Sequence, residues 1–322
     1  MNKKALFNFL RVVVSIGLIA FLFWLMRGSL GQVGHTIKKV DKTMLFLSFV
    51  IFTLGMALMG IRLRFIMKAQ NMLITFADSV YLTFIGLFFN NFLPTSAGGD
   101  LVKIYYAAKK TGKKMPSAAC VIFDRLLGSF TLILMVLIAS IFIKDPFADK
   151  IIKSFLAVAL VISFIIILIL FNRRVAKKTH FLKSLLRSLN LEEKIKGIYE
   201  IINNYKEHPR LLLSAVFFSA ILQLINYYAL YLVAVSLKLD IPIKFIFLLM
   251  PIISTAGMMP SINGIGPSEA TFVLFFGPMV GKGEAFAFSI LCRGLTFAMS
   301  IIGGLFYLFQ KQHKTHKEGD IK

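Results

Sequence analysis

The chain has 322 residues, of which 57% are hydrophobic, and its mean hydropathy is +0.79. Soluble domains are about 45–50% apolar, so this composition excludes a soluble protein and predicts an integral membrane protein. Lys and Arg outnumber Asp and Glu by 37 to 15, which gives a net charge of +22. The basic residues cluster at the ends of apolar runs and no aromatic-basic module accompanies them, so we expect membrane orientation rather than a nucleic-acid partner.

The two cysteines, Cys120 and Cys292, lie inside apolar runs, and the five histidines stand at or beyond the ends of such runs. No Cys or His grouping has metal-ligand spacing, so we expect no disulfide framework, no metal and no cofactor. No nucleophile–base pair or phosphate-binding loop lies within the apolar runs, and we therefore predict that the protein is not an enzyme.

The N-terminal part of the chain is expected to begin in the cytoplasm, because basic residues precede the first apolar run. That run, Phe9–Met26, is long enough to span a membrane and is not followed by a small-residue cleavage site, so it predicts a retained helix. The second predicted span is Met44–Met67. Arg62 and Arg64 near its end are interpreted as charges that reach the membrane surface.

The next apolar run, Phe76–Leu93, ends in a break that contains Pro94, Gly98 and Gly99. Proline lacks the N–H donor and glycine weakens a helix, so no helix passes through this stretch unbroken. Broken backbone at membrane depth is tolerated only where protein or a water-filled cavity surrounds it. A full span would place the five lysines that follow outside, against the positive-inside rule. We therefore predict a re-entrant hairpin that returns through Asp100–Ala108.

A second hairpin is predicted downstream, entering through Phe245–Met259 and returning through Glu269–Val280. Its break, residues 260–267, contains Pro260, Gly264, Gly266 and Pro267. The remaining predicted spans are Ser117–Ile143, Ile151–Phe171, Leu211–Ser236 and Glu284–Phe309. A cytoplasmic amphipathic segment is expected at 178–206, and a basic, polar, disordered tail at 311–322.

The predicted fold class is an all-α polytopic membrane protein with about eight apolar segments. We interpret these as six full spans and two oppositely oriented re-entrant hairpins, in one transmembrane domain (1–310) with both termini cytoplasmic. Each half contains a Gly/Pro break, a carboxylate and then an Arg at nearly equal spacing: Asp100 with Arg125, and Glu269 with Arg293. Such order predicts an inverted repeat of about 44–143 and 210–309.

Charged residues well inside the predicted spans need compensation. Asp124, Arg125 and Arg293 each cost about 2.5–3.5 kcal/mol near a bilayer centre on insertion scales. One interpretation is structural pairing of Asp100 with Arg125 and of Glu269 with Arg293.

The other interpretation adds a ligand to the same charges. A guanidinium is a two-pronged donor suited to phosphate, and helix N-termini after the breaks favour anions. We therefore treat the carboxylates and Arg residues named above as candidate lipid-binding groups. Candidate cavity-lining amides are Asn90, Asn91 and Asn263. A polar face made of Gln223, Asn226 and Tyr227 is interpreted as helix-packing contacts.

Four motifs in combination resemble one known family. They are Leu93-Pro94-Thr95-Ser96-Ala97-Gly98-Gly99-Asp100, Asp124-Arg125-Leu126-Leu127-Gly128, Gly264-Ile265-Gly266-Pro267-Ser268-Glu269 and Arg293-Gly294. Together they resemble the lysylphosphatidylglycerol synthase transmembrane-region family. In the bacterial multiple peptide resistance factor this region is regarded as a lipid flippase module, so the resemblance implies a lipid-handling protein of a bacterial cell membrane, linked to antimicrobial peptide resistance. The soluble aminoacyl-transferase domain of that factor has no counterpart in this sequence, so we expect no lysyltransferase activity.

The function expected from these observations is a flippase or scramblase for a phosphate-bearing lipid, phosphatidylglycerol or its lysyl form. One alternative is a carrier of polyprenyl phosphate or a polyprenyl-linked sugar. A second is a membrane enzyme acting on a lipid headgroup. A third is a non-transporting subunit that docks a lipid-modifying synthase at its cytoplasmic face. A homodimer is expected by base rate alone.

Overall fold

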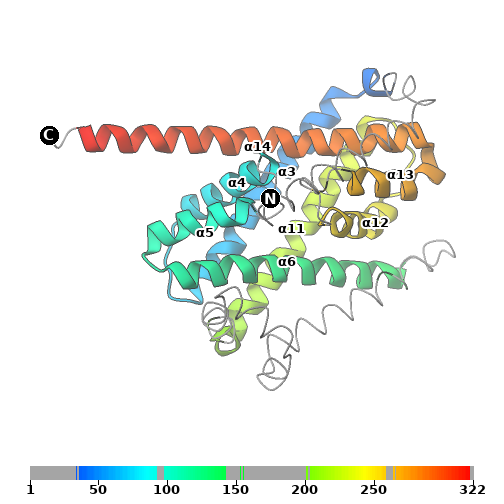
Figure 1. The fold of residues 1–322 in the computed structure, drawn as a ribbon. Helices are drawn as coiled ribbons and strands as arrows, with labels where there is room; N and C mark the ends of the chain where they lie inside the picture. The colour runs from blue at the N-terminus through cyan, green and yellow to red at the C-terminus, as the bar shows by residue number, and fades with distance from the viewer. Residues whose placement is uncertain are drawn as a thin grey trace, which may run out of the picture.

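The computed structural model describes residues 34, 36–92, 98–142, 153, 155, 201, 204–258, 264 and 266–319 (Figure 1). These residues form helices and turns, with no strand among them. The long helices are α3 (Lys42–Lys68), α6 (Lys114–Phe142), α11 (Pro209–Ser236) and α14 (Lys282–Gly319). The shorter ones are α4 (Phe76–Phe92), α5 (Gly98–Thr111), α12 (Ile243–Ala256), α13 (Pro267–Val280) and the one-turn 3₁₀ helix η1 (Tyr205–Glu207).

The helix composition confirms a multi-pass, all-α membrane protein. Within the described residues, α3, α6, α11 and the apolar part of α14 are long and apolar enough to cross a membrane. The predicted spans Phe9–Met26 and Ile151–Phe171 and the amphipathic segment 178–206 lie wholly or mostly outside the described residues, as do Pro94, Pro260 and Asn263.

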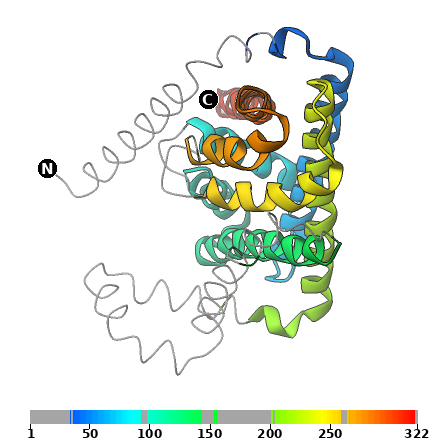
Figure 2. The same cartoon turned by 90° about the vertical axis from the view of Figure 1, so that its right-hand side faces the viewer.

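Helices α3 and α11 form an antiparallel pair. The backbone N–H of Asp41, which caps α3, donates to the carbonyl of Ser236 at the end of α11 (2.8 Å). About two turns further along α3, Ser48 Oγ donates to the carbonyl of Ala229 on α11 (2.8 Å). The numbering therefore rises along one helix as it falls along the other. Figure 2 shows these two helices as one layer, against which the remaining helices stack.

The two halves of the chain pair their helices in the same order. Helix α3 packs on α4, α4 on α5 and α5 on α6, just as α11 packs on α12, α12 on α13 and α13 on α14. Between the halves, α4 packs on α14 and α12 packs on α6. Helices α6 and α14 run in opposite directions in Figure 1, as α3 and α11 do. This is the pairing expected of two similar units in opposite orientation.

The core consists of apolar side chains at the crossings of these helices. Phe276, Phe288, Ile246 and Leu248 are fully buried between α12, α13 and α14 and their neighbours. By contrast, α3 and α11 carry large exposed apolar side chains, of which Leu213 is 72% exposed. A surface of this kind suits contact with lipid chains, because the chains are as apolar as the side chains themselves.

The first predicted hairpin begins and ends at the same end of the molecule. Lys110 Nζ in the last turn of α5 lies 2.5 Å from Asp78 Oδ1 in the first turn of α4. Beyond α5, Lys113 Nζ donates to the carbonyl of Asn71, just after α3 (3.3 Å). The end of α3, the start of α4 and the end of α5 therefore lie together, as the hairpin requires.

The break in this hairpin is shorter than the predicted Pro94–Gly99. Gly98 and Gly99 belong to the first turn of α5. Asn90 Oδ1 accepts the N–H of Gly99 (2.8 Å), which satisfies one of the free donors of that turn. A Cβ at Gly99 would overlap the carbonyl oxygen of Gly86, so glycine permits the close approach of α5 to α4.

The second break also differs from its predicted bounds. Helix α12 ends at Ala256, before the predicted Met259, and α13 begins at Pro267, which was assigned to the break. Proline suits the first helical position because its missing N–H is not needed there. Gly264 and Gly266 have φ of 73° and 97°, in the left-handed region where glycine is favoured.

The predicted tail begins at residue 311, within the bounds of the last helix. Helix α14 continues to Gly319. The tail is rich in Lys, Gln and Glu, whose helix propensities are high, so its polarity does not end the helix. Helix α6 likewise begins at Lys114, ahead of the predicted Ser117.

Substitution of Gly303 by Ala is expected to loosen the contact of α14 with α4, because a Cβ at Gly303 would overlap the carbonyl oxygen of Phe84. Overpacking of this kind costs about 1–3 kcal/mol. The matched control is Gly294→Ala on the same helix, where nothing lies within 4 Å of the added carbon. Thermal unfolding of the detergent-solubilised protein measures both variants. Equal unfolding temperatures for the two would contradict this packing.

Candidate functional site

The two carboxylate–Arg pairs occupy matching positions in the two halves. Asp100 is the third residue of α5 and Glu269 is the third residue of α13. Arg125 is the twelfth residue of α6 and Arg293 is the twelfth residue of α14. Each carboxylate therefore stands in the first turn of a helix, where the helix dipole favours a negative charge, and faces an Arg on the next helix.

In the first half, Arg125 Nη1 lies 2.6 Å from Asp100 Oδ2. The Arg125 side chain is 43% exposed and the Asp100 side chain 19%. The predicted pair is thus present, and its guanidinium is the more accessible partner.

In the second half, Arg293 donates from Nη2 (2.8 Å) and Nε (3.0 Å) to Glu269 Oε1. The other carboxylate oxygen, Oε2, accepts the backbone N–H of Gly266 (2.7 Å). The side chains of Arg293 and Glu269 are only 19% and 12% exposed. Glu269 therefore joins three elements: the break before α13, α13 itself and α14.

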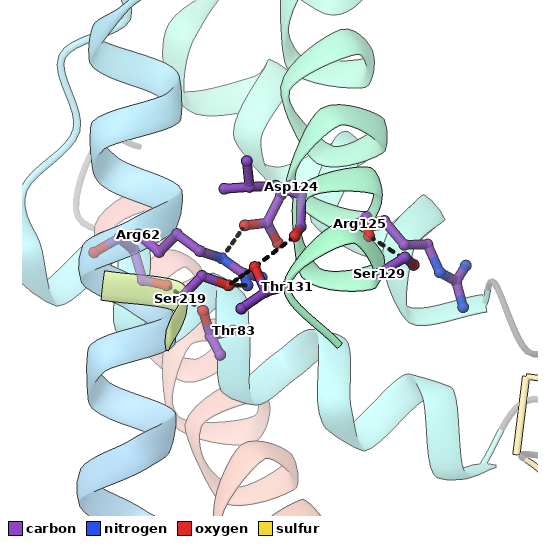
Figure 3. A network of polar contacts seen from close by, with 9 residues as sticks. Arg62, Thr83, Asp124, Arg125, Ser129, Thr131 and Ser219 are labelled. Atoms are coloured by element: carbon purple, nitrogen blue, oxygen red, sulfur yellow. Dashed lines mark hydrogen bonds and ion pairs between the residues drawn. The ribbon is translucent and has the colours of Figure 1, made fainter. Parts of the chain in front are cut away.

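Asp124, which was predicted as a candidate lipid-binding group, has a different partner from these two pairs. It accepts a hydrogen bond from Arg62 Nε on α3 (2.7 Å), and both side chains are at most 5% exposed. Arg62 Nη1 also donates to Ser219 on α11 (2.9 Å), which is hydrogen-bonded to Thr131 on α6. In Figure 3, Asp124 and Arg125 point to different sides of α6.

The interpretation of Arg62 as a charge reaching the membrane surface is therefore wrong. Its position near the end of α3 suggested exposure, but the approach of α6 and α11 encloses it. The resulting network of Arg62, Asp124, Ser219 and Thr131 joins three long helices at one point.

The predicted cavity-lining amides separate in the structure. Asn91 is buried against α14, where its Nδ2 donates to Ser300 Oγ. Asn90, one residue earlier, points to another side of α4 and binds the N–H of Gly99.

A cavity of about 390 Å³ lies between the two halves and brings Arg125 and Arg293 together. Pockets of 300–1,000 Å³ are typical of ligand sites. Asp100 and Asp124 are not part of its wall. The polar residues of the wall are Asn90, Arg125, Gln223, Asn226, Tyr227, Ser254, Ser268, Glu269, Ser289, Arg293 and Thr296.

Gln223, Asn226 and Tyr227 form the α11 side of this cavity, although they were interpreted as helix-packing groups. Their spacing of three and four residues puts them on one helix face. That polar stripe on an otherwise apolar helix was the signal in the sequence, and only the placement of α11 beside the cavity turns it into a candidate binding surface.

The comparisons with known proteins agree with this architecture. The sequence matches the family described as the lysylphosphatidylglycerol synthase TM region over residues 8–304. The chain belongs to this family. It is also 24% identical to a UPF0104 membrane protein of Pyrococcus horikoshii over 330 aligned positions, which cover 94% of this chain and 96% of that protein. No solved structure is significantly similar to the chain.

The arrangement can bind an anion more readily than a metal. Among the described residues, no group of three or more His, Cys, Asp or Glu side chains could hold a metal ion. Two guanidinium groups in one cavity instead offer several N–H donors in a planar, two-pronged geometry suited to phosphate.

The Arg62–Asp124 pair is expected to be essential for stability. Asp124→Asn leaves the enclosed Arg62 charge without its ionic partner, which typically costs about 3–5 kcal/mol. The control is Asp78→Asn, whose Lys110 partner is 49% exposed and whose loss should cost at most about 1 kcal/mol. Thermal unfolding in detergent should show a much larger loss for Asp124→Asn.

The double variant Arg62→Met/Asp124→Leu removes both charges at once and should recover much of that stability. A double variant as unstable as Asp124→Asn would mean that packing around these side chains, rather than their charges, holds the three helices together.

Proposed function

We propose that this protein is a flippase or scramblase that moves a lipid with a phosphate-bearing headgroup, such as phosphatidylglycerol, between the leaflets of a bacterial cell membrane. The observation that carries the proposal is that Arg125 and Arg293, from the two halves of the chain, line one cavity. Membership of a family described as the membrane region of a lipid-modifying enzyme supports a lipid substrate.

The depth of the two Arg residues supports transport across the bilayer. Each is the twelfth residue of its helix, which places it about 16 Å along the axis at 1.5 Å per residue. That is about half of a hydrocarbon core roughly 30 Å thick. Polar sites near the midplane, between oppositely oriented halves with broken helices, are typical of transporters with inverted repeats.

The carboxylate partners suggest how a headgroup enters and leaves. A phosphate that reaches the cavity competes with Asp100 for Arg125 and with Glu269 for Arg293. Arg125 is the more exposed of the two and its carboxylate makes the simpler contact, so it is the first to engage the phosphate. When the lipid leaves, each Arg returns to its carboxylate, and neither charge is left uncompensated within the membrane.

The same site chemistry would serve a polyprenyl phosphate, because the guanidinium groups bind the phosphate whatever chain carries it. We propose transport without chemical change of the lipid, and turnover of the headgroup would favour an enzyme instead. Cytoplasmic termini, a synthase docked at the cytoplasmic helices near Glu192–Glu207 and a homodimer remain predictions from the sequence.

The function is tested by leaflet exchange of fluorescent phosphatidylglycerol in liposomes that contain the full chain. Arg125→Ala and Arg293→Ala should each lower the exchange rate at least about tenfold, since a hydrogen-bonded charge pair is worth about 1.5–3 kcal/mol. Arg210→Ala, an exposed Arg at the start of α11, is the control and should retain exchange.

The double variant Asp100→Asn/Arg125→Gln distinguishes a structural role of Arg125 from phosphate binding. It removes both charges of the pair, so no unpaired charge is left behind. If the pair only holds α5 to α6, this double variant restores exchange. If Arg125 binds the phosphate, the double variant stays inactive although it unfolds at the wild-type temperature. The proposal would be overturned if liposomes that contain the wild-type protein exchange lipid between leaflets no faster than empty liposomes, for both phosphatidylglycerol and polyprenyl phosphate.

A further inference from the structure

The charges that line the cavity are two guanidinium groups and one carboxylate, Arg125, Arg293 and Glu269. Both oxygens of Glu269 are engaged, one by Arg293 and the other by the N–H of Gly266. The other two intramembrane carboxylates of the described residues also have Arg partners: Asp100 binds Arg125 and Asp124 binds Arg62. An ammonium group in this cavity would therefore meet a net positive wall and compete with existing ion pairs.

The wall that α11 contributes to the cavity is neutral and polar. Tyr227 is 2% exposed, and its hydroxyl makes no hydrogen bond of acceptable geometry among the described residues, although Ser254 stands beside it. Ser254 Oγ donates to the carbonyl of Met250 (2.8 Å). Ser254 is the nearest partner that this hydroxyl has among the described residues, and both side chains line the cavity, so a polar group of a ligand there would compete for the same contacts.

Asn226 adds a second polar group to this wall. Among the described residues its Oδ1 has no hydrogen-bond partner, and it packs against Gly55 of α3, where an added Cβ would overlap it. The same residue lines the cavity. Gln223 lies one turn earlier on the same face. Phenol and amide groups both donate and accept, which suits hydroxyl groups, whereas an ammonium group only donates.

We infer that the cavity selects a lipid phosphate whose headgroup is neutral and hydroxylated, with Arg125 and Arg293 on the phosphate and the α11 face of Gln223, Asn226 and Tyr227 on the hydroxyls. The inference rests on the proposed function for the location of the site. It deepens that function by separating phosphatidylglycerol or a phosphate-linked sugar lipid from the cationic lysyl form of phosphatidylglycerol, which the site disfavours.

Binding is measured apart from transport, by thermal stabilisation of the detergent-solubilised full chain with short-chain lipids. Dioctanoyl phosphatidylglycerol is compared with dioctanoyl phosphatidylmethanol, which has the same charge and no hydroxyl, and with dioctanoyl lysylphosphatidylglycerol. We expect phosphatidylglycerol to bind about tenfold more tightly than phosphatidylmethanol, as one or two hydrogen bonds would provide, and the lysyl lipid to bind most weakly. Comparison of the affinities of a farnesyl phosphate sugar and phosphatidylglycerol identifies which hydroxylated lipid the protein prefers.

Tyr227→Phe deletes only the hydroxyl and should reduce the preference for phosphatidylglycerol over phosphatidylmethanol about three- to tenfold. Tyr228→Phe makes the same change on the next residue, which is 42% exposed and outside the cavity, and should leave the preference unchanged. If Tyr227→Phe fails to fold, Gln223→Glu provides the second test. The added carboxylate should raise the affinity for the lysyl lipid relative to phosphatidylglycerol.

Equal binding of phosphatidylglycerol and phosphatidylmethanol, or tighter binding of the lysyl lipid, would overturn the inference even if lipid exchange is observed. If Tyr227→Phe keeps the preference for phosphatidylglycerol over phosphatidylmethanol, other residues bind the lipid hydroxyls. That result would also overturn the inference. Selective binding without any lipid exchange would support the inference while overturning the proposed transport function, so the two failures are distinguishable.

Discussion

A charge within an apolar helix bundle must be neutralised by another element, and the described structure depends on three such compensations. Arg62 with Asp124 joins α3 to α6, Arg125 with Asp100 joins α6 to α5, and Arg293 with Glu269 joins α14 to α13. The first pair is enclosed at the junction of three long helices. The other two hold the short helix after each break against the long helix that follows it, so they position the breaks as well as compensate charge.

The matching positions of the two pairs that follow the breaks explain why one cavity holds both guanidinium groups. Each Arg lies at the same distance along its helix, and α6 and α14 run in opposite directions. At about 16 Å along a helix that crosses a hydrocarbon core roughly 30 Å thick, each Arg comes close to the midplane from whichever side its helix enters.

Helix α11 connects the structural and functional parts of the molecule. One side forms the antiparallel pair with α3 and supplies Ser219 to the Arg62 network. The same helix supplies Gln223, Asn226 and Tyr227 to the wall of the cavity, and Asn226 also packs against Gly55 of α3. The helix that the core depends on therefore also carries groups that line the cavity, so substitutions there need stability controls.

The sequence by itself determined the local features: apolar runs, the two breaks with their Pro and Gly residues, and the pairing of Asp100 with Arg125 and of Glu269 with Arg293. The breaks follow from a short-range rule, because proline ends a helix. The pairing was predicted as one of two interpretations, because a charge inside an apolar run needs compensation and each carboxylate precedes its Arg by nearly the same number of residues. Only the tertiary structure decided that Arg62 is enclosed by Asp124, that Asn91 meets Ser300 and that both halves share one cavity. Those contacts join residues 62 and 209 positions apart, or different halves, and depend on how the helices cross, which no local pattern encodes.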